Sequence, residues 1–104
     1  MILDIDIMAT KRVSIWDRSI TYNLAPMYYK CIDKELGFKK LNNMSCKDAL
    51  PILNKAINEL IDNKEEYEKL NPSNGWGSYD GLLKALKDMR ECCEDNKDGV
   101  IEVC

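Results

Sequence analysis

The chain has 104 residues, of which 45% are hydrophobic and 32% are charged, and its formal net charge is -3. These values are typical of one globular domain, which we expect to span residues 1–104. The acidic balance and scattered basic residues argue against a nucleic-acid polymer as partner, and no apolar run reaches the roughly 20 residues of a membrane span. Residues 1–6 contain two aspartates and lack the basic region of a signal peptide, so we expect a cytoplasmic protein.

Cysteine and histidine usage limits the available chemistry. The five cysteines are an odd number without a C-x-x-C pair, which indicates reduced thiols rather than a disulfide framework. Histidine is absent from the sequence, which removes Cys-His and Ser-His nucleophile pairs and mixed Cys/His zinc sites. We therefore expect no catalytic residue, no metal site and no cofactor.

Two strands are predicted at the start of the chain. Leu3, Ile5 and Ile7 alternate with other residues, and this period of two is typical of a half-buried strand. A second strand over residues 13–16 would form a hairpin with the first. The open face of the sheet would then carry Asp4, Asp6, Met8, Ser14 and Trp16.

Two helices are predicted in the middle of the chain. The first would begin near Asn23 and end at Gly37. For the second, Ser45 and Asp48 have the spacing of a capping box, but a start at Ser45 would place Pro51 inside the helix. We prefer a start at Asp48, which leaves Pro51 in the first turn. The buried stripe of this helix is predicted to contain Leu50, Leu53, Ile57, Leu60 and Ile61.

The remaining elements complete the predicted fold. Helical spacing continues past a break near residue 63 to residue 70, another helix starts at residues 78–80, and residues 100–103 form a last strand. The order β-β-α-α-α-β predicts an α+β fold, in which helices pack on one face of a small antiparallel sheet of about three strands. Because Trp16 and Met8 would lie on the open face, we expect a homo-oligomer.

Residues 74–81 form the most unusual segment, with two large aromatic residues among three glycines. Glycine lets a partner approach the backbone closely, and the N–H groups at a helix start favour anionic groups. On this interpretation the ligand-binding residues are Asn74, Gly75, Trp76, Ser78 and Tyr79. The alternative is a structural helix-entry turn, with Trp76 as a lid over the core and Ser78 or Asp80 as the cap.

Thr21, Tyr22 and Asn23 form a second candidate, where a strand leads into a helix. Their side chains would suit hydrogen bonding to a base or a sugar, and they could form the second wall of the same ligand site. The alternative is that Asn23 caps the helix and Tyr22 packs in the core.

Asp4 and Asp6 form an Asp-x-Asp pair that could hold magnesium. A solvated strand face explains them equally well. The charge run at residues 64–66 is typical of an exposed helix surface.

The two candidate segments resemble those of a family of small phage and prophage proteins of unknown function. The resemblance rests on Ile-Thr-Tyr-Asn-Leu at residues 20–24 and Asn-Gly-Trp-Gly-Ser-Tyr-Asp-Gly at residues 74–81, and it extends over nearly the whole chain. This sequence has Tyr22 where many relatives have histidine, and Ser19 where many have asparagine. The resemblance implies a viral accessory protein rather than a known activity.

These observations lead to one main hypothesis and two alternatives. The main hypothesis is a non-catalytic protein that binds a small nucleotide-like ligand and sequesters a host immune signal. The first alternative is a protein-interaction module that inhibits a host protein through its open sheet face or acidic helices. The second is a magnesium-dependent hydrolase that uses Asp4 and Asp6.

Overall fold

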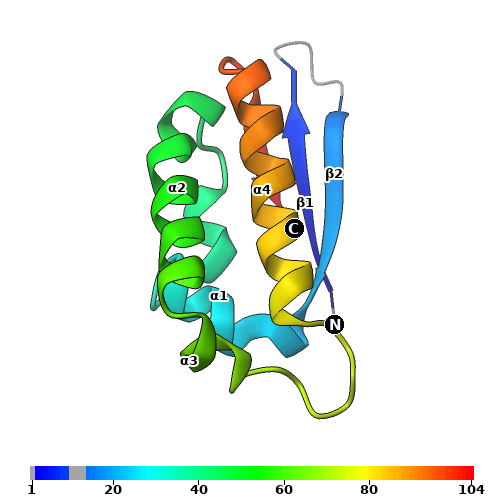
Figure 1. Ribbon diagram of the computed structural model, residues 1–104. Helices are drawn as coiled ribbons and strands as arrows, with labels where there is room; N and C mark the ends of the chain where they lie inside the picture. Colours follow the sequence, from blue (N-terminus) through cyan, green and yellow to red (C-terminus); the bar gives the residue numbers. More distant parts are fainter. Residues whose placement is uncertain (1, 10–13) are drawn as a thin grey trace.

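The computed structural model describes residues 2–9 and 14–104, and within them it confirms the α+β fold. These residues form one open antiparallel sheet of three strands, with four α-helices and two short 3-10 helices (Figure 1). The elements are β1 (Ile2–Met8), β2 (Ser14–Thr21), η1 (Tyr22–Leu24), α1 (Ala25–Cys31), η2 (Gly37–Leu41), α2 (Cys46–Asp62), α3 (Lys64–Glu68), α4 (Tyr79–Asp95) and β3 (Val100–Val103).

β1 is the central strand, in the order β2-β1-β3. Leu3, Ile5 and Ile7 are buried as the alternation predicts, and they face the helices. The helices lie together on one side of the sheet (Figure 1), and Ile101 from β3 joins the same core. No helix of the described residues covers the opposite face of the sheet, which we call the open face.

The prediction that Trp16 lies on the open face is wrong. Trp16 is the strand partner of buried Ile7 and packs against the core, because the register of β1 and β2 shifts between Ile7 and Met8. Such an irregularity changes the face on which the following side chains lie. One of the two residues that suggested self-association is therefore removed from the open face. Val13, the expected start of this strand, lies outside the described residues.

The first helix is shorter than predicted. α1 ends at Cys31, and Asp33 then accepts hydrogen bonds from the backbone N–H groups of Glu35 and Leu36, at 2.9 and 2.8 Å. An aspartate that bonds the backbone in this way favours a turn over continued helix. The chain resumes as η2 from Gly37, whose φ is +57°.

The second helix begins earlier than preferred. Ser45 is the N-cap, and its hydroxyl accepts the backbone N–H of Asp48 at 3.2 Å, so Pro51 does lie inside α2. The N–H groups of Cys46 and Lys47 donate to carbonyls of residues 99 and 97 beside β3. These bonds satisfy free N–H groups of the first turn. The stabilisation that they provide outweighs the cost of the one helix hydrogen bond that Pro51 cannot donate. Ile61, predicted in the buried stripe, is 49% exposed.

The later elements follow the predictions. Helicity breaks at Asn63 and continues as α3, α4 begins at Tyr79, and β3 covers residues 100–103. Among the helices of the described residues, none combines the length and apolarity needed to cross a membrane.

Candidate functional site

The two candidate segments meet within one chain. Asn74, in the loop between α3 and α4, donates a side-chain hydrogen bond to the side chain of Asn23 at 3.3 Å. Asn23 in turn donates to the hydroxyl of Thr21 at 3.0 Å, and Thr21 also accepts the backbone N–H of Asn23. Thr21 rather than Asn23 therefore caps η1. This polar network fixes the loop to the end of β2.

Gly77 brings the two segments into direct contact. Its φ is +98°, and a Cβ atom built on it would lie 2.8 Å from Thr21 and 2.9 Å from Leu24. A side chain at this position would be strained by the backbone conformation and would also collide with two neighbours. Glycine is therefore required for the loop to pack against residues 21–24.

Trp76 is the most exposed large hydrophobic residue of the described chain, at 68%. Its backbone N–H donates to the side chain of Asn74 at 2.9 Å, so the loop holds the tryptophan in position while its ring faces solvent. The expectation that Trp76 forms a lid over the core is wrong. Gly75, with φ of +75°, has open space around it.

The other two residues of the predicted ligand loop have structural roles. Ser78 is the N-cap of α4 and accepts the N–H of Gly81 at 3.0 Å, as the helix-entry alternative predicts. Tyr79, expected in the ligand wall, instead points into the core with 2% exposure. Its hydroxyl donates to the carbonyl of Leu60 at 2.5 Å, and its N–H donates to Asn71. A ligand on the loop surface cannot reach this ring.

Tyr22 lines a separate pocket of about 300 Å³, whose lining includes no residue of the loop. We call this the tyrosine pocket, and its lining combines side chains of β1, η1, α1 and η2 with Leu36: Leu3, Tyr22, Ala25, Tyr28, Tyr29, Leu36 and Lys39. The lining is mainly apolar, with three phenol groups and one ammonium group. This composition is typical of small-molecule sites, in which a few polar groups orient a ligand in an apolar cavity.

Gly37 shapes the tyrosine pocket. A Cβ atom at this left-handed position would lie 3.0 Å from the ring of Tyr28 and 3.3 Å from that of Tyr29. The two rings have centroids 5.3 Å apart, and Phe38 supports Tyr28 from the core side at 4.9 Å. Burial raises the pKa of Tyr28 to about 12, so this phenol is neutral at ordinary pH. Lys39 is therefore the charged group of the pocket lining.

The neighbouring hollow is larger, at about 680 Å³, but it carries both signs of charge. Its lysines are Lys30, Lys34, Lys40 and Lys55, and its acidic residues are Asp33, Glu35 and Glu59. Opposite charges within one open hollow screen each other, which leaves a weaker field for a charged ligand. The tyrosine pocket is the better candidate.

The cysteines with raised pKa values are poor candidates for a catalytic nucleophile. Burial raises the pKa of Cys31 to about 12 and also raises the pKa values of Cys46, Cys92 and Cys93. A raised pKa keeps a thiol protonated and unreactive. The described residues contain no group of three or more Cys, Asp or Glu side chains placed to hold a metal ion, and Asp4 accepts a hydrogen bond from Ser19 at 2.8 Å.

Sequence reasoning included Tyr22 but missed the rest of the tyrosine pocket. The available signal was the pair Tyr28-Tyr29 followed by Gly37, which matches no recognised binding motif. Lys39 lies beyond the predicted helix end and has no motif of its own.

Comparisons with known proteins do not extend these observations, because no family model, curated protein or solved structure matches the chain.

Proposed function

We propose that this protein is a phage-type accessory protein that binds a small nucleotide-like ligand in the tyrosine pocket without turning it over. In the host cytoplasm it would sequester a nucleotide immune signal. The observation that carries the proposal is the pocket itself, a mainly apolar cavity of about 300 Å³ that is lined by Tyr22 and Tyr29 and to which Lys39 supplies one cation. The viral context rests on the family resemblance of residues 20–24 and 74–81.

The ligand class follows from the lining. Phenol rings offer flat apolar faces for a planar base, and base–aromatic stacking contributes roughly 1–3 kcal/mol per base. The ammonium group of Lys39 can pair with a phosphate as a point charge. The loop network from Asn74 to Thr21 supports the site indirectly, because it fixes the residues on either side of Tyr22.

Binding without turnover is the chemistry that these residues support. The sequence has no histidine to act as a general base near neutral pH. The thiols with raised pKa values are poor nucleophiles. A sequestering protein needs only affinity, so these features are no obstacle to the proposed role.

The test is calorimetric titration with AMP and with a cyclic dinucleotide as probes, together with native mass spectrometry of protein from cells with active nucleotide-based immunity. We expect one probe to bind, and Tyr22→Ala to weaken it by roughly tenfold, as the loss of one stacking contact implies. Lys39→Ala should weaken it too. The matched control is Lys40→Ala, which removes the adjacent lysine but lines the other hollow.

Two results would contradict the proposal. One is the absence of binding for both probes together with a ligand-free mass spectrum. The other is an equal loss of affinity in Lys39→Ala and Lys40→Ala, which would show that general charge and not the pocket attracts the probe.

A further inference from the structure

The open face of the sheet carries a transverse row of carboxylates. Asp6 on β1 is the direct strand partner of Asp17 on β2 and of Glu102 on β3. Adjacent strands lie about 4.8 Å apart, so three acidic side chains stand side by side, and Asp4 lies two residues before Asp6 on β1. Like charges directly opposite each other destabilise a sheet. This face therefore keeps an arrangement that its own fold does not favour.

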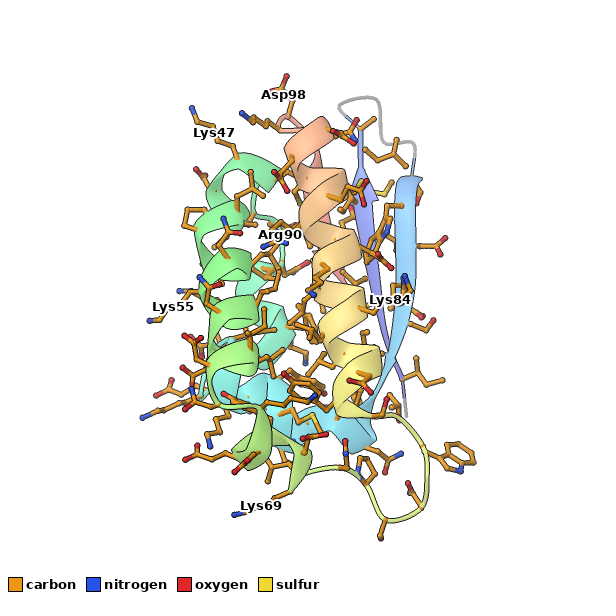
Figure 2. All side chains as sticks on the ribbon, viewed as in Figure 1. Lys47, Lys55, Lys69, Lys84, Arg90 and Asp98 are labelled. Carbon is orange, nitrogen blue, oxygen red and sulfur yellow. The ribbon has the colours of Figure 1, made fainter. Side chains whose placement is uncertain are left out.

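The described parts of the strands supply almost no basic side chains to balance these carboxylates. Arg18 is the one basic residue in the described parts of the strands, and it lies on the helix side, where it pairs with Asp88 at 2.6 Å. Figure 2 shows Lys47 and Lys55 on the helical layer, and Lys84 on α4 pairs with Asp88 at 3.3 Å. Within the described residues, the carboxylates of the open face form no ion pair, and Asp4 and Asp6 accept hydrogen bonds from Ser19 and Ser14 instead.

An exposed apolar tip adjoins this acidic face. Ile2, at 59% exposure, is the strand partner of Thr21, and Gly77 packs against the methyl group of Thr21. The 68% exposed Trp76 precedes Gly77 in the loop that passes around this end of the sheet (Figure 1). The two most exposed large hydrophobic residues of the described chain thus belong to segments that contact Thr21, since Ile2 is its strand partner and Trp76 precedes Gly77.

We propose that this face docks an arginine-rich segment of a partner protein, with the carboxylates pairing guanidinium groups and Trp76 stacking on one of them. Arginine fits both features, because its planar group pairs with carboxylates through two N–H groups and stacks on aromatic rings. The protein contains an example of this combination, since Arg18 bonds Asp88 and lies 5.8 Å from the ring centroid of Trp16. A second copy of the same acidic face would be repelled.

The test is an NMR titration of the full chain with acetylated hexa-arginine amide, and with hexa-lysine as the equal-charge probe. We expect hexa-arginine to shift the backbone amides of Asp6, Asp17 and Glu102 and the indole N–H of Trp76, and to bind about threefold more tightly than hexa-lysine, as stacking on an exposed indole implies. Affinity should fall as salt concentration rises.

Two variants decide between specific docking and general attraction. Asp6→Asn should weaken hexa-arginine binding while raising the melting temperature, because it removes the centre of the repulsive row. Its control is Asp62→Asn, which removes one exposed charge at the end of α2 and should leave the affinity nearly unchanged. Trp76→Ala should abolish the preference for arginine over lysine. Tyr22→Ala should not affect this binding, which separates it from the nucleotide-like ligand.

The proposal is overturned if the two peptides bind equally, if the indole N–H of Trp76 does not shift, or if Asp62→Asn weakens binding as much as Asp6→Asn. Each of these results would reduce the effect to the net charge of the protein.

Discussion

The tyrosine pocket and the Trp76 loop lie on either side of residues 21–24, and they present aromatic residues in opposite ways. In the pocket, Tyr22, Tyr28 and Tyr29 line one hollow, and the ring of Tyr28 is buried. In the loop, one indole projects into solvent and only the backbone beneath it is held. A concave aromatic lining suits a small ligand, whereas a projecting aromatic residue suits the surface of a macromolecule.

Both regions depend on a glycine in a left-handed conformation. Gly37 has the rings of Tyr28 and Tyr29 against it, and Gly77 has Thr21 and Leu24 against it. A Cβ atom built on Gly77 would lie 2.8 Å from its nearest neighbour, compared with 3.0 Å for one built on Gly37. In both regions, a left-handed glycine without a side chain lets the neighbouring segments approach closely.

The largest expected effect separates the two aromatic residues of the loop segment. Tyr79→Ala should lower the free energy of unfolding by about 3–5 kcal/mol, because it empties a core position and leaves the Leu60 carbonyl without its donor. Trp76→Ala should change it by less than about 0.5 kcal/mol, since the ring is exposed. Urea unfolding measures both. A large loss in Trp76→Ala would mean that the loop tryptophan packs in the core and would end the comparison.

A graded effect is expected in the glycine series. Gly77→Ala should cost about 2–4 kcal/mol, because strain and collision add. Gly75→Ala should cost about 1 kcal/mol, since it has backbone strain without a collision. Gly37→Ala should fall between them. The same unfolding measurement applies, and equal costs for Gly75 and Gly77 would show that the contact with Thr21 and Leu24 is unimportant.

Alkaline pH should lower the free energy of unfolding through the tyrosine pocket but not through the Trp76 loop. The pKa of Tyr28 is raised by burial from 10.0 to about 12, so the folded state holds this proton more tightly than the unfolded state. The resulting stability is fully present below pH 10 and is lost as the pH rises through the folded pKa, by up to about 2 kcal/mol. Tyr28→Phe should reduce the loss of stability between these pH values, measured by unfolding at each. Trp76→Phe should leave it unchanged, and a change as large as that in Tyr28→Phe would contradict this assignment.

The smallest expected effect concerns the open face beside the loop. Asp6→Asn should raise the free energy of unfolding by roughly 0.2–1 kcal/mol, because it relieves repulsion from Asp17 and Glu102. High salt should reduce the gain. A loss of stability in low salt would show that the carboxylate row is not repulsive, and it would weaken the case for a cationic partner.

Local patterns predicted much of the fold. The alternation of Leu3, Ile5 and Ile7 predicted β1, and the helical spacing after residue 78 predicted α4 with Ser78 as its cap. These predictions succeeded because the period of apolar residues directly determines which face of a strand or helix is buried. The same reasoning identified Thr21, Asn23, Asn74 and Trp76 as unusual, but it could not say which way each side chain points.

The predictions failed where residues far away in the sequence determine the local structure. Ser45 caps α2 because carbonyls of residues 97 and 99 accept the first N–H groups of the helix. Those carbonyls lie some fifty residues away in the chain. Trp16 turns toward the helices because of a register shift between two strands. A local pattern contains neither the partner of a hydrogen bond nor the register of a strand pair.

The sequence by itself thus determined the α+β class, the order of the elements and the absence of histidine chemistry, because composition and periodicity act locally. Only the tertiary structure showed that one aromatic residue lines a pocket, one lies in the core and one is exposed to solvent. The physical reason is that Tyr22, Trp76 and Tyr79 are chemically similar, and their roles depend on which neighbours exclude water from each ring. Those neighbours come from segments that meet only in the folded chain.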